Sequence, residues 1–135
     1  MANPSLLTQI LIARAARPFG ATLGFPVPGT FLSIGIIDTL YLVEVARAAG
    51  VLKNVDVRPW FREYLTWMTT HQNGKDEQDA KNNHGTCWTM QVAEFARYTN
   101  DAALMALCRE RFKTLHVPGQ IAADGSFPLG LRKPS

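Results

Sequence analysis

Apolar residues recur at three- and four-residue spacing along most of this chain, and this period most constrains the fold that it can adopt. Such spacing places apolar side chains on one face of an α-helix, whereas a half-buried strand needs alternation at every second residue. No stretch of the sequence alternates for long enough to build a sheet. The pattern therefore predicts an all-α fold of antiparallel helical hairpins joined by short connections.

Five helices are expected from this pattern. They are predicted from Pro4 to near Pro18, over 36–50, from Asp56 to Met68, from the Asn83 region through Ala96, and from Asn100 to a break at Pro118-Gly119. Asp56 is expected to cap the third helix, with Pro59 tolerated in its first turn. Loops are expected at 24–29, at 72–82 with its charged run 75–81, and from Gln120 onward.

The length of 135 residues and an apolar content of 47% favour one domain, 1–135. A net charge of +3 fits an acidic partner without identifying one, and we find no nucleic-acid motif or phosphate loop. Cys87 and Cys108 are expected as buried thiols in preference to a bridge, because their spacing fits apolar helical patterns. The apolar stretch 6–16 is shorter than a ~20-residue span and lacks a basic leader, so neither a membrane helix nor a signal peptide is predicted.

The segment Lys81–Trp88, with the letters KNNHGTCW, gathers amides and an imidazole just before a strongly helical run. Polar donors at a helix N-terminus suit an anionic ligand. Asparagine is also a leading N-cap residue, so Asn83 and His84 either cap the helix or take part in chemistry. No His or Cys spacing favours a metal, no cofactor is expected, and His71 and His116 are interpreted as structural.

The same segment resembles the Asn-Asn-His signature of the alginate lyase-like polysaccharide lyases. Further blocks resemble this family in the same order along the chain: Gly35–Thr39, Trp67-Met68, Asn73–Gln78, Pro118–Gln120 and Asp124–Pro128. The resemblance implies an (α/α) toroid, here a partial one, and cleavage of uronic-acid polymers such as alginate by β-elimination. It also implies an acidic polysaccharide as partner and a periplasmic or extracellular location.

By this resemblance, Asn83 would bind the uronate carboxylate, His84 would neutralise it or act as base, and Arg132 falls near the family's arginine. A base can remove the C5 proton only if the neighbouring carboxylate is neutralised, because the developing anion must be stabilised. Amide, imidazolium and guanidinium groups supply that stabilisation. The three residues are therefore the predicted catalytic set.

The sequence departs from the family after Arg132, where tyrosines are expected and the chain stops at Ser135. Tyr41, Tyr64 and Tyr98 lie in predicted helices, where core packing is favoured over catalysis. We therefore expect a truncated, fragmentary or degenerate family member, whose exposed apolar surface would favour oligomers. Two functions stay open, a uronan lyase and a non-catalytic helical module that binds an acidic glycan or a protein.

Overall fold

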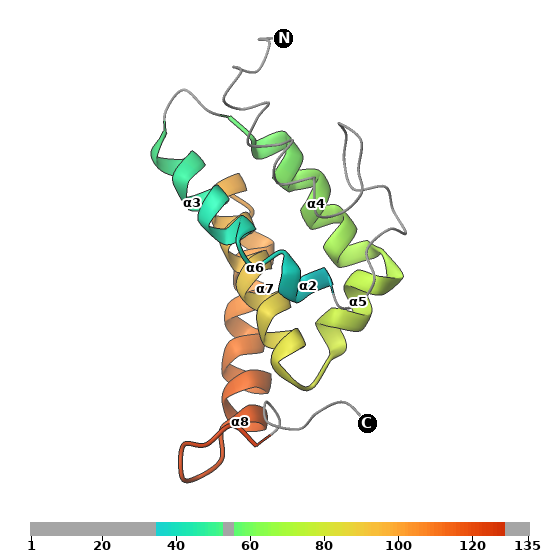
Figure 1. The fold of residues 1–135 in the computed structure, drawn as a ribbon, viewed down its shortest axis with the longest axis vertical. Coiled ribbons are helices and arrows are strands. Elements are labelled where there is room, and N and C mark those ends of the chain that lie inside the picture. Colours follow the sequence, from blue (N-terminus) through green and yellow to red (C-terminus); the bar gives the residue numbers. More distant parts are fainter. Residues whose placement is uncertain (1–34, 53–55, 129–135) are drawn as a thin grey trace.

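The computed structural model describes residues 35–52 and 56–128, and every regular element in these ranges is helical. Figure 1 shows α4 and α5 running in one direction, α6 returning beside them, and α7 running back along α6. The elements are α2 (Gly35–Asp38), α3 (Leu42–Val51), α4 (Arg58–Thr70), α5 (Gln72–Asp79), α6 (Asn83–Thr99), α7 (Ala102–Arg111), the π-helical segment η2 (Phe112–His116) and α8 (Val117–Gln120). The predicted all-α fold is confirmed, and the partial (α/α) toroid stays a prediction.

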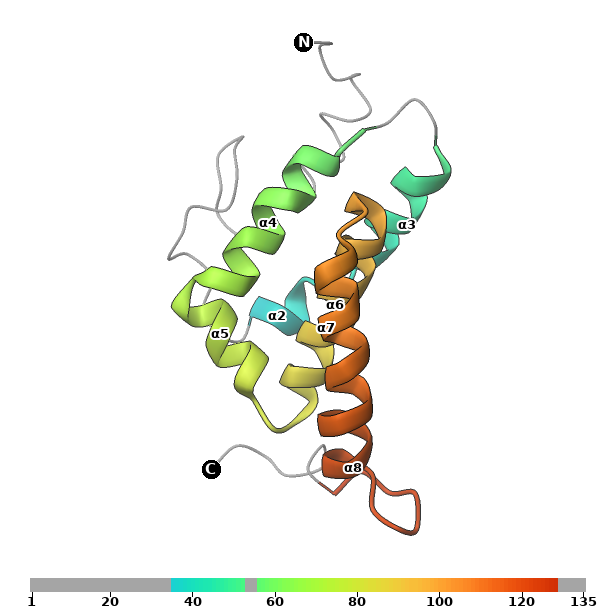
Figure 2. The ribbon, with the colours of Figure 1, turned by 180° about the vertical axis from the view of Figure 1, so that it is seen from behind.

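Helix α6 forms the centre of the packing, with α2, α3, α4, α5, α7 and η2 all against it (Figures 1 and 2). Its inward residues Trp88, Val92 and Phe95 are fully buried. The Trp88 indole N–H also donates to the Met68 carbonyl oxygen at 3.2 Å, which fixes α6 against the end of α4. Each such side chain contributes roughly 1.5–3 kcal/mol through burial of apolar surface.

Aromatic residues fill much of the space between α4 and α6. Trp60, Phe61 and Trp88 are buried, whereas Trp67 is half-buried and packs against the same cluster. The rings of Phe61 and Phe95 lie 4.7 Å apart between their centroids. These aromatic residues therefore pack the core between the two helices.

The helix predicted over 36–50 is interrupted. A turn at Thr39–Tyr41 separates α2 from α3, so the uninterrupted helix was wrong. The Thr39 hydroxyl lies 3.1 Å from the Ile36 carbonyl oxygen and 2.9 Å from Gln91 Oε1, and the Gln91 amide donates to the same carbonyl at 2.7 Å. These buried hydrogen bonds to α6 replace helical ones, because side-chain partners compete for backbone groups.

Helix α4 begins at Arg58, and its N-cap position is Val57, one residue past the predicted Asp56. Pro59 lies in the first turn, and the Asp56 carboxylate accepts a hydrogen bond from the Arg58 N–H at 3.1 Å. The helix continues to Thr70, two residues past the predicted end at Met68. The predicted helix from Pro4 to Pro18 and the predicted loop at 24–29 lie outside the described residues.

The predicted loop at 72–82 was wrong, because Gln72–Asp79 forms helix α5. The charged run 75–81 is therefore mostly helical, and its Glu77 is buried instead of solvated. The His71 side chain caps this helix by accepting from the Asn73 N–H at 3.2 Å. Helix α5 has no apolar side chain, so the hydrophobic period could not reveal it.

The last helical stretch begins as predicted and ends later than predicted. Asn100, with φ of 61°, ends α6 in the left-handed conformation, and the Asp101 carboxylate caps α7 by accepting from the Leu104 N–H at 3.0 Å. Pro118 does not break the helix. The π-helical segment η2 leads directly into α8, and Pro118 occupies the first turn of α8, where no N–H is required of it.

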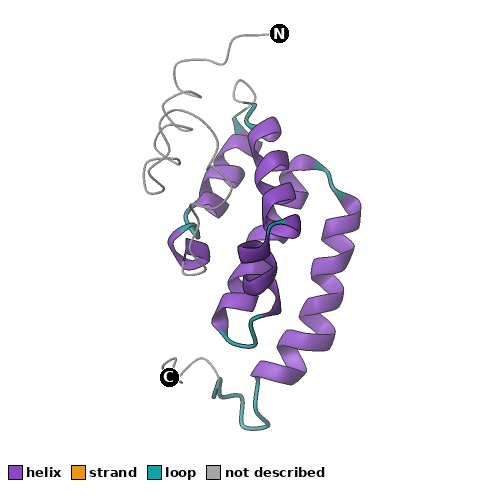
Figure 3. Cartoon of the chain, turned by 90° about the vertical axis from the view of Figure 1, so that its right-hand side faces the viewer, coloured by secondary structure: helices purple, strands orange, loops and turns teal. Residues whose placement is uncertain are grey.

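The apolar face predicted for this last stretch is only partly buried. Cys108 is buried and Leu104 is half-buried, whereas Leu107, Phe112 and Leu115 are exposed. Figure 3 shows the long helical stretch of α7, η2 and α8 at one side of the other described helices. Cys87 and Cys108 are both free thiols, as expected, although Cys87 is only half-buried. Burial raises the pKa of Cys108 to about 11.

The tyrosines do not all behave as predicted. Tyr64 and Tyr98 are buried, and the Tyr98 hydroxyl accepts from the Val57 N–H at 3.2 Å. Burial raises the pKa of Tyr64. Tyr41 lies in the turn before α3 and is 38% exposed, so its predicted place in the core was wrong.

Candidate active site

Asn82, and not Asn83, caps the N-terminus of α6. Its side-chain oxygen accepts a hydrogen bond from the His84 N–H at 3.0 Å, and its backbone is extended. Asn83 is the first residue of the helix and is exposed, and its side chain has no hydrogen-bond partner in the described part of the chain. The capping role therefore falls on one asparagine and leaves the other amide open to a ligand at the positive end of α6.

His84 pairs with a buried carboxylate. Its Nδ1 atom lies 2.7 Å from Glu77 Oε2, and the Glu77 side chain is 6% exposed whereas that of His84 is 26% exposed. Burial raises the pKa of Glu77, and the hydrogen bond and charge of His84 lower it again in part. The pair therefore presents an imidazole to solvent on one side and anchors it to a carboxylate on the other.

Two glycines allow close backbone contacts around this pair, Gly85 of α6 against the C-cap of α5 and Gly74 of α5 against α4. A Cβ atom on Gly85 would lie less than 3.0 Å from the Ala80 carbonyl oxygen, and one on Gly74 would lie less than 3.0 Å from that of Met68. Real Cβ atoms do not occupy such positions, so backbone would have to move. Gly85 therefore permits the close approach of α6 to the end of α5, and Gly74 permits the close approach of α5 to α4.

Gln120, at the end of α8, holds the connection between α5 and α6. Its side-chain N–H groups donate to the carbonyl oxygens of Asn82 at 2.9 Å and Lys81 at 3.2 Å, and its oxygen accepts from the Thr86 hydroxyl at 2.6 Å. The structure thus joins the block Pro118–Gln120 to the segment Lys81–Trp88, and the residues bonded to each other are 34 to 39 positions apart in the sequence.

Beneath the first turns of α6 lies a layer of polar groups from α7 and η2. The Arg111 guanidinium lies over the Trp88 ring at 5.3 Å from its centroid and donates to the Gln78 carbonyl oxygen at the end of α5. His116 Nε2 lies 2.7 Å from the Thr89 hydroxyl. Burial lowers the pKa of His116, and the nearby Arg111 charge lowers it further.

A family model described as alginate lyase matches residues 21–134 of this sequence. The chain belongs to the alginate lyase family. The match covers all the residues of the site described above, including Asn83, His84 and the Gln120 contact. No match to the chain was found among curated proteins or among solved structures.

Within this alginate lyase family member, the predicted residues Asn83 and His84 are adjacent at the start of α6. Arg132 lies outside the described residues. Sequence reasoning missed the roles of Glu77 and Gln120, although both lie in blocks that resemble the family. The polar residue types of Glu77 and Gln120 within those blocks were the only hint in the sequence that they could contribute to a site. Hydrophobic periodicity gives no information on whether either residue lies near His84.

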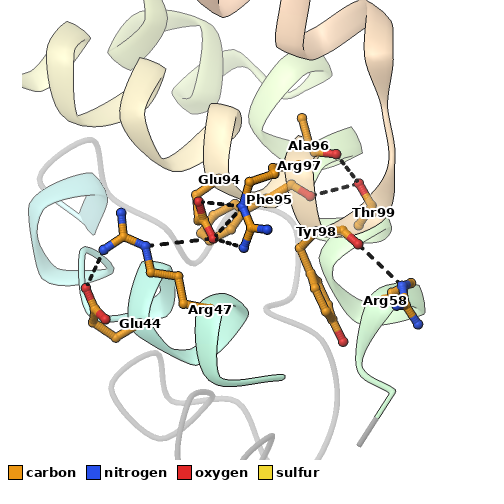
Figure 4. Close-up of polar contacts among 9 residues, drawn as sticks. All are labelled: Glu44, Arg47, Arg58, Glu94, Phe95, Ala96, Arg97, Tyr98 and Thr99. Atoms are coloured by element: carbon orange, nitrogen blue, oxygen red, sulfur yellow. Dashed lines mark hydrogen bonds and ion pairs between the residues drawn. The ribbon is translucent and has the colours of Figure 1, made fainter. Parts of the chain in front are cut away.

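A second polar cluster lies toward the other end of α6 and holds neighbouring helices in place (Figure 4). The Glu94 carboxylate pairs with Arg97 at 2.6 Å and with Arg47 of α3 at 3.9 Å. The Arg58 side chain of α4 donates to the Tyr98 carbonyl oxygen at 3.3 Å. Its basic groups are paired within the fold, so we interpret this cluster as structural.

Other kinds of site are not indicated in the described ranges. They contain no group of three His, Cys, Asp or Glu residues able to hold a metal, and none of their helices is long and apolar enough to cross a membrane. A surface hollow of about 320 Å³ lies between α4 and α7, away from His84. Its lining residues are Arg62, Leu65, Thr66, Thr69, Asp101 and Leu104.

Proposed function

We propose that this member of the alginate lyase family is a polysaccharide lyase that cleaves a uronic-acid polymer such as alginate by β-elimination. The observation that supports it best is the pairing at the start of α6 of an exposed Asn83 amide with a half-buried His84 imidazole. Both residues lie in the first turn of α6, where the helix dipole favours an anion. A uronate carboxylate is such an anion.

In this reaction the C5–H bond breaks and its electron pair forms a double bond to C4. The C4–O bond to the neighbouring sugar breaks at the same time, and the departing oxygen takes up a proton. Asn83 binds the carboxylate beside C5, which stabilises the developing negative charge. His84 lies next to it, either as the base or as a second neutralising group. We assign Arg132 to the same carboxylate from its place in the family pattern.

The remaining parts of the proposal concern the protein as a whole. Residues 1–135 form one domain, whose helical hairpins are part of an (α/α) toroid. The chain acts in the periplasm or outside the cell, where uronans occur. No cofactor takes part, because charge neutralisation by protein side chains is enough to acidify the C5 proton.

The direct experiment supplies polyuronate to the purified chain and follows the ultraviolet absorbance of the unsaturated product. We expect a steady rise for the wild type. His84→Gln, which keeps a donor toward Glu77, should reduce the rate roughly 10²–10⁴-fold, the usual effect of losing a general acid or base. Lys113→Gln, an exposed substitution on η2, serves as the control. A wild type that gives no absorbance with any uronan tested contradicts the lyase function.

A second function, binding of an acidic glycan without cleavage, is supported by the positions of the tyrosines. Two of the three tyrosines in the sequence, Tyr64 and Tyr98, are buried in the core. Under this function, immobilised polyuronate retains the chain at low salt and releases it at high salt, because screening weakens charge contacts. Retention without absorbance change distinguishes binding from cleavage, and Asn83→Ala should weaken it.

A further inference from the structure

Helix α5 buries a carboxylate where a surface helix normally buries an apolar stripe. Its sequence is QNGKDEQD, and its buried residues are Gly74 and Glu77. Burying a carboxylate costs free energy unless a partner compensates for the lost hydration. Hydrophobic packing gives no reason for Glu77 at this position, so the reason must lie in what its carboxylate contacts.

The contact is the Nδ1 atom of His84, at 2.7 Å. An imidazole that donates from Nδ1 to a carboxylate has its other nitrogen, Nε2, free to accept a proton or to meet a ligand. His84 is 26% exposed on its side chain, so part of the ring is accessible from solvent. The carboxylate thus determines which of the two nitrogens is available.

The backbone around this pair is constrained at several points. Gly74 lies against the Met68 carbonyl and Gly85 against that of Ala80, both too close for any Cβ atom. The Asn82 side-chain oxygen accepts a hydrogen bond from the His84 N–H at 3.0 Å. The Gln120 side chain donates to the Asn82 carbonyl oxygen at 2.9 Å. These contacts fix the connection between α5 and α6, and with it the position of the His84 imidazole. A preorganised site requires such support.

We propose that Glu77 is the positioning residue of His84: its buried carboxylate holds the Nδ1–H, fixes the ring, and makes Nε2 the nitrogen that takes the C5 proton. This inference rests on the proposed lyase function and decides between the two roles left open for His84. The proton passes from C5 to Nε2, and the carboxylate stabilises the imidazolium that forms. The imidazolium returns one proton to the departing C4 oxygen, which restores the neutral ring.

The first test reads the protonated nitrogen directly, by long-range proton–nitrogen NMR of ¹⁵N-labelled protein. The sequence has three histidines, and His71 and His116 serve as internal references. We expect the neutral His84 ring to carry its proton on Nδ1 in the wild type. In Glu77→Gln, which is nearly isosteric, this preference should weaken toward the mixture typical of a free imidazole. Glu63→Gln, on the exposed face of α4, should change nothing.

The second test separates positioning from mere stability. Glu77→Gln should lower kcat roughly 10²–10⁴-fold, as expected when a base loses its correct tautomer, and should leave KM nearly unchanged. Circular dichroism and thermal unfolding check that the variant is folded. If the pair were purely structural, Glu77→Gln would lower the stability of the protein without lowering kcat selectively at constant KM.

The outcomes distinguish the inference from the function on which it rests. If Nδ1 is unprotonated in neutral wild-type His84, or if the tautomer is the same in Glu77→Gln, the positioning role is wrong whether or not the chain cleaves uronan. If the tautomer responds as expected and the wild type cleaves no uronan, the lyase function and the proton transfer to Nε2 are both wrong. An active wild type with a responsive tautomer and a selective loss of kcat supports both.

Discussion

The side-chain amide of Gln120 donates to the carbonyl oxygen of Asn82 across 2.9 Å, which joins the end of α8 to the N-cap of α6. The same side-chain amide also donates to the carbonyl oxygen of Lys81, and its oxygen accepts a hydrogen bond from the Thr86 hydroxyl. Three hydrogen bonds from one side chain therefore hold the connection that carries the Asn-Asn-His signature. This contact makes the site depend on residues far along the sequence.

Replacing Gln120 with alanine should loosen this connection. We expect the free energy of unfolding to fall by about 1–2 kcal/mol, because the loss includes a donor to two backbone carbonyls. Amide hydrogen exchange should become faster in the first turn of α6. Gln72→Ala is the matched control, since Gln72 is exposed and its side chain donates to Asp76 within the same helix, and its effect should stay within about 0.5 kcal/mol. Equal effects of the two variants would contradict the role of Gln120.

The two adjacent asparagines should separate stability from ligand binding. Asn82→Ala removes the N-cap of α6 and should lower the free energy of unfolding by about 1 kcal/mol. Asn83→Ala removes an exposed amide that has no partner among the described residues, and it should leave stability within about 0.5 kcal/mol. Its effect should appear instead as weaker retention on immobilised polyuronate and slower cleavage. Thermal unfolding and a binding assay on both variants check this, and the reverse pattern would exclude Asn83 as the ligand residue.

Two glycine substitutions should have opposite effects on stability. Gly85→Ala places a Cβ atom against the Ala80 carbonyl, and we expect a loss of roughly 1–3 kcal/mol as the backbone shifts. Gly119→Ala, in α8, meets no atom within 4 Å and should be neutral or stabilising by up to about 1 kcal/mol. Urea unfolding of both variants measures the difference. Equal stability of the two variants would show that α5 and α6 do not approach as closely as described.

Stability at high pH should depend on Cys108. Burial raises the pKa of its thiol to about 11, and the nearby Arg111 lowers it in part. The unfolded thiol ionises near 9, so the stabilising contribution is complete below that pH and is lost as the pH rises toward 11. Relative to Cys108→Ala, the wild type should lose about 2 kcal/mol of unfolding free energy between these values. Urea unfolding at several pH values checks this, and a constant difference between the two proteins would contradict it.

Much of the fold could be predicted because hydrophobic periodicity reports which helix faces pack together. Helices α4 and α6 have wide apolar stripes, and their aromatic residues Phe61 and Phe95 meet in the core as such stripes predict. The start of α7 was predicted from Asn100 and Asp101, whose side chains and backbone preferences act locally. Local signals of this kind need no knowledge of the partner helix.

The missed elements depend on contacts that a single segment does not encode. Helix α5 is stabilised by a cap, a close glycine contact and a buried carboxylate, none of which produces an apolar period. The turn at Thr39 depends on Gln91, fifty-two residues later. For the candidate site, the signature located Asn83 and His84, whereas the partner of His84 became visible only when α5 was folded against α6.

The exposed face of α5 can accept substitutions during evolution without affecting its buried face. Lys75, Asp76 and Asp79 are exposed, whereas the buried residues of α5 are Gly74 and Glu77. Glu77 is the residue that contacts His84. Substitutions on the outer face can therefore alter the local charge of α5 while the imidazole of His84 keeps its place. The exposed residues of α5 can thus vary, in nature or by design, without disturbing the contact between Glu77 and His84.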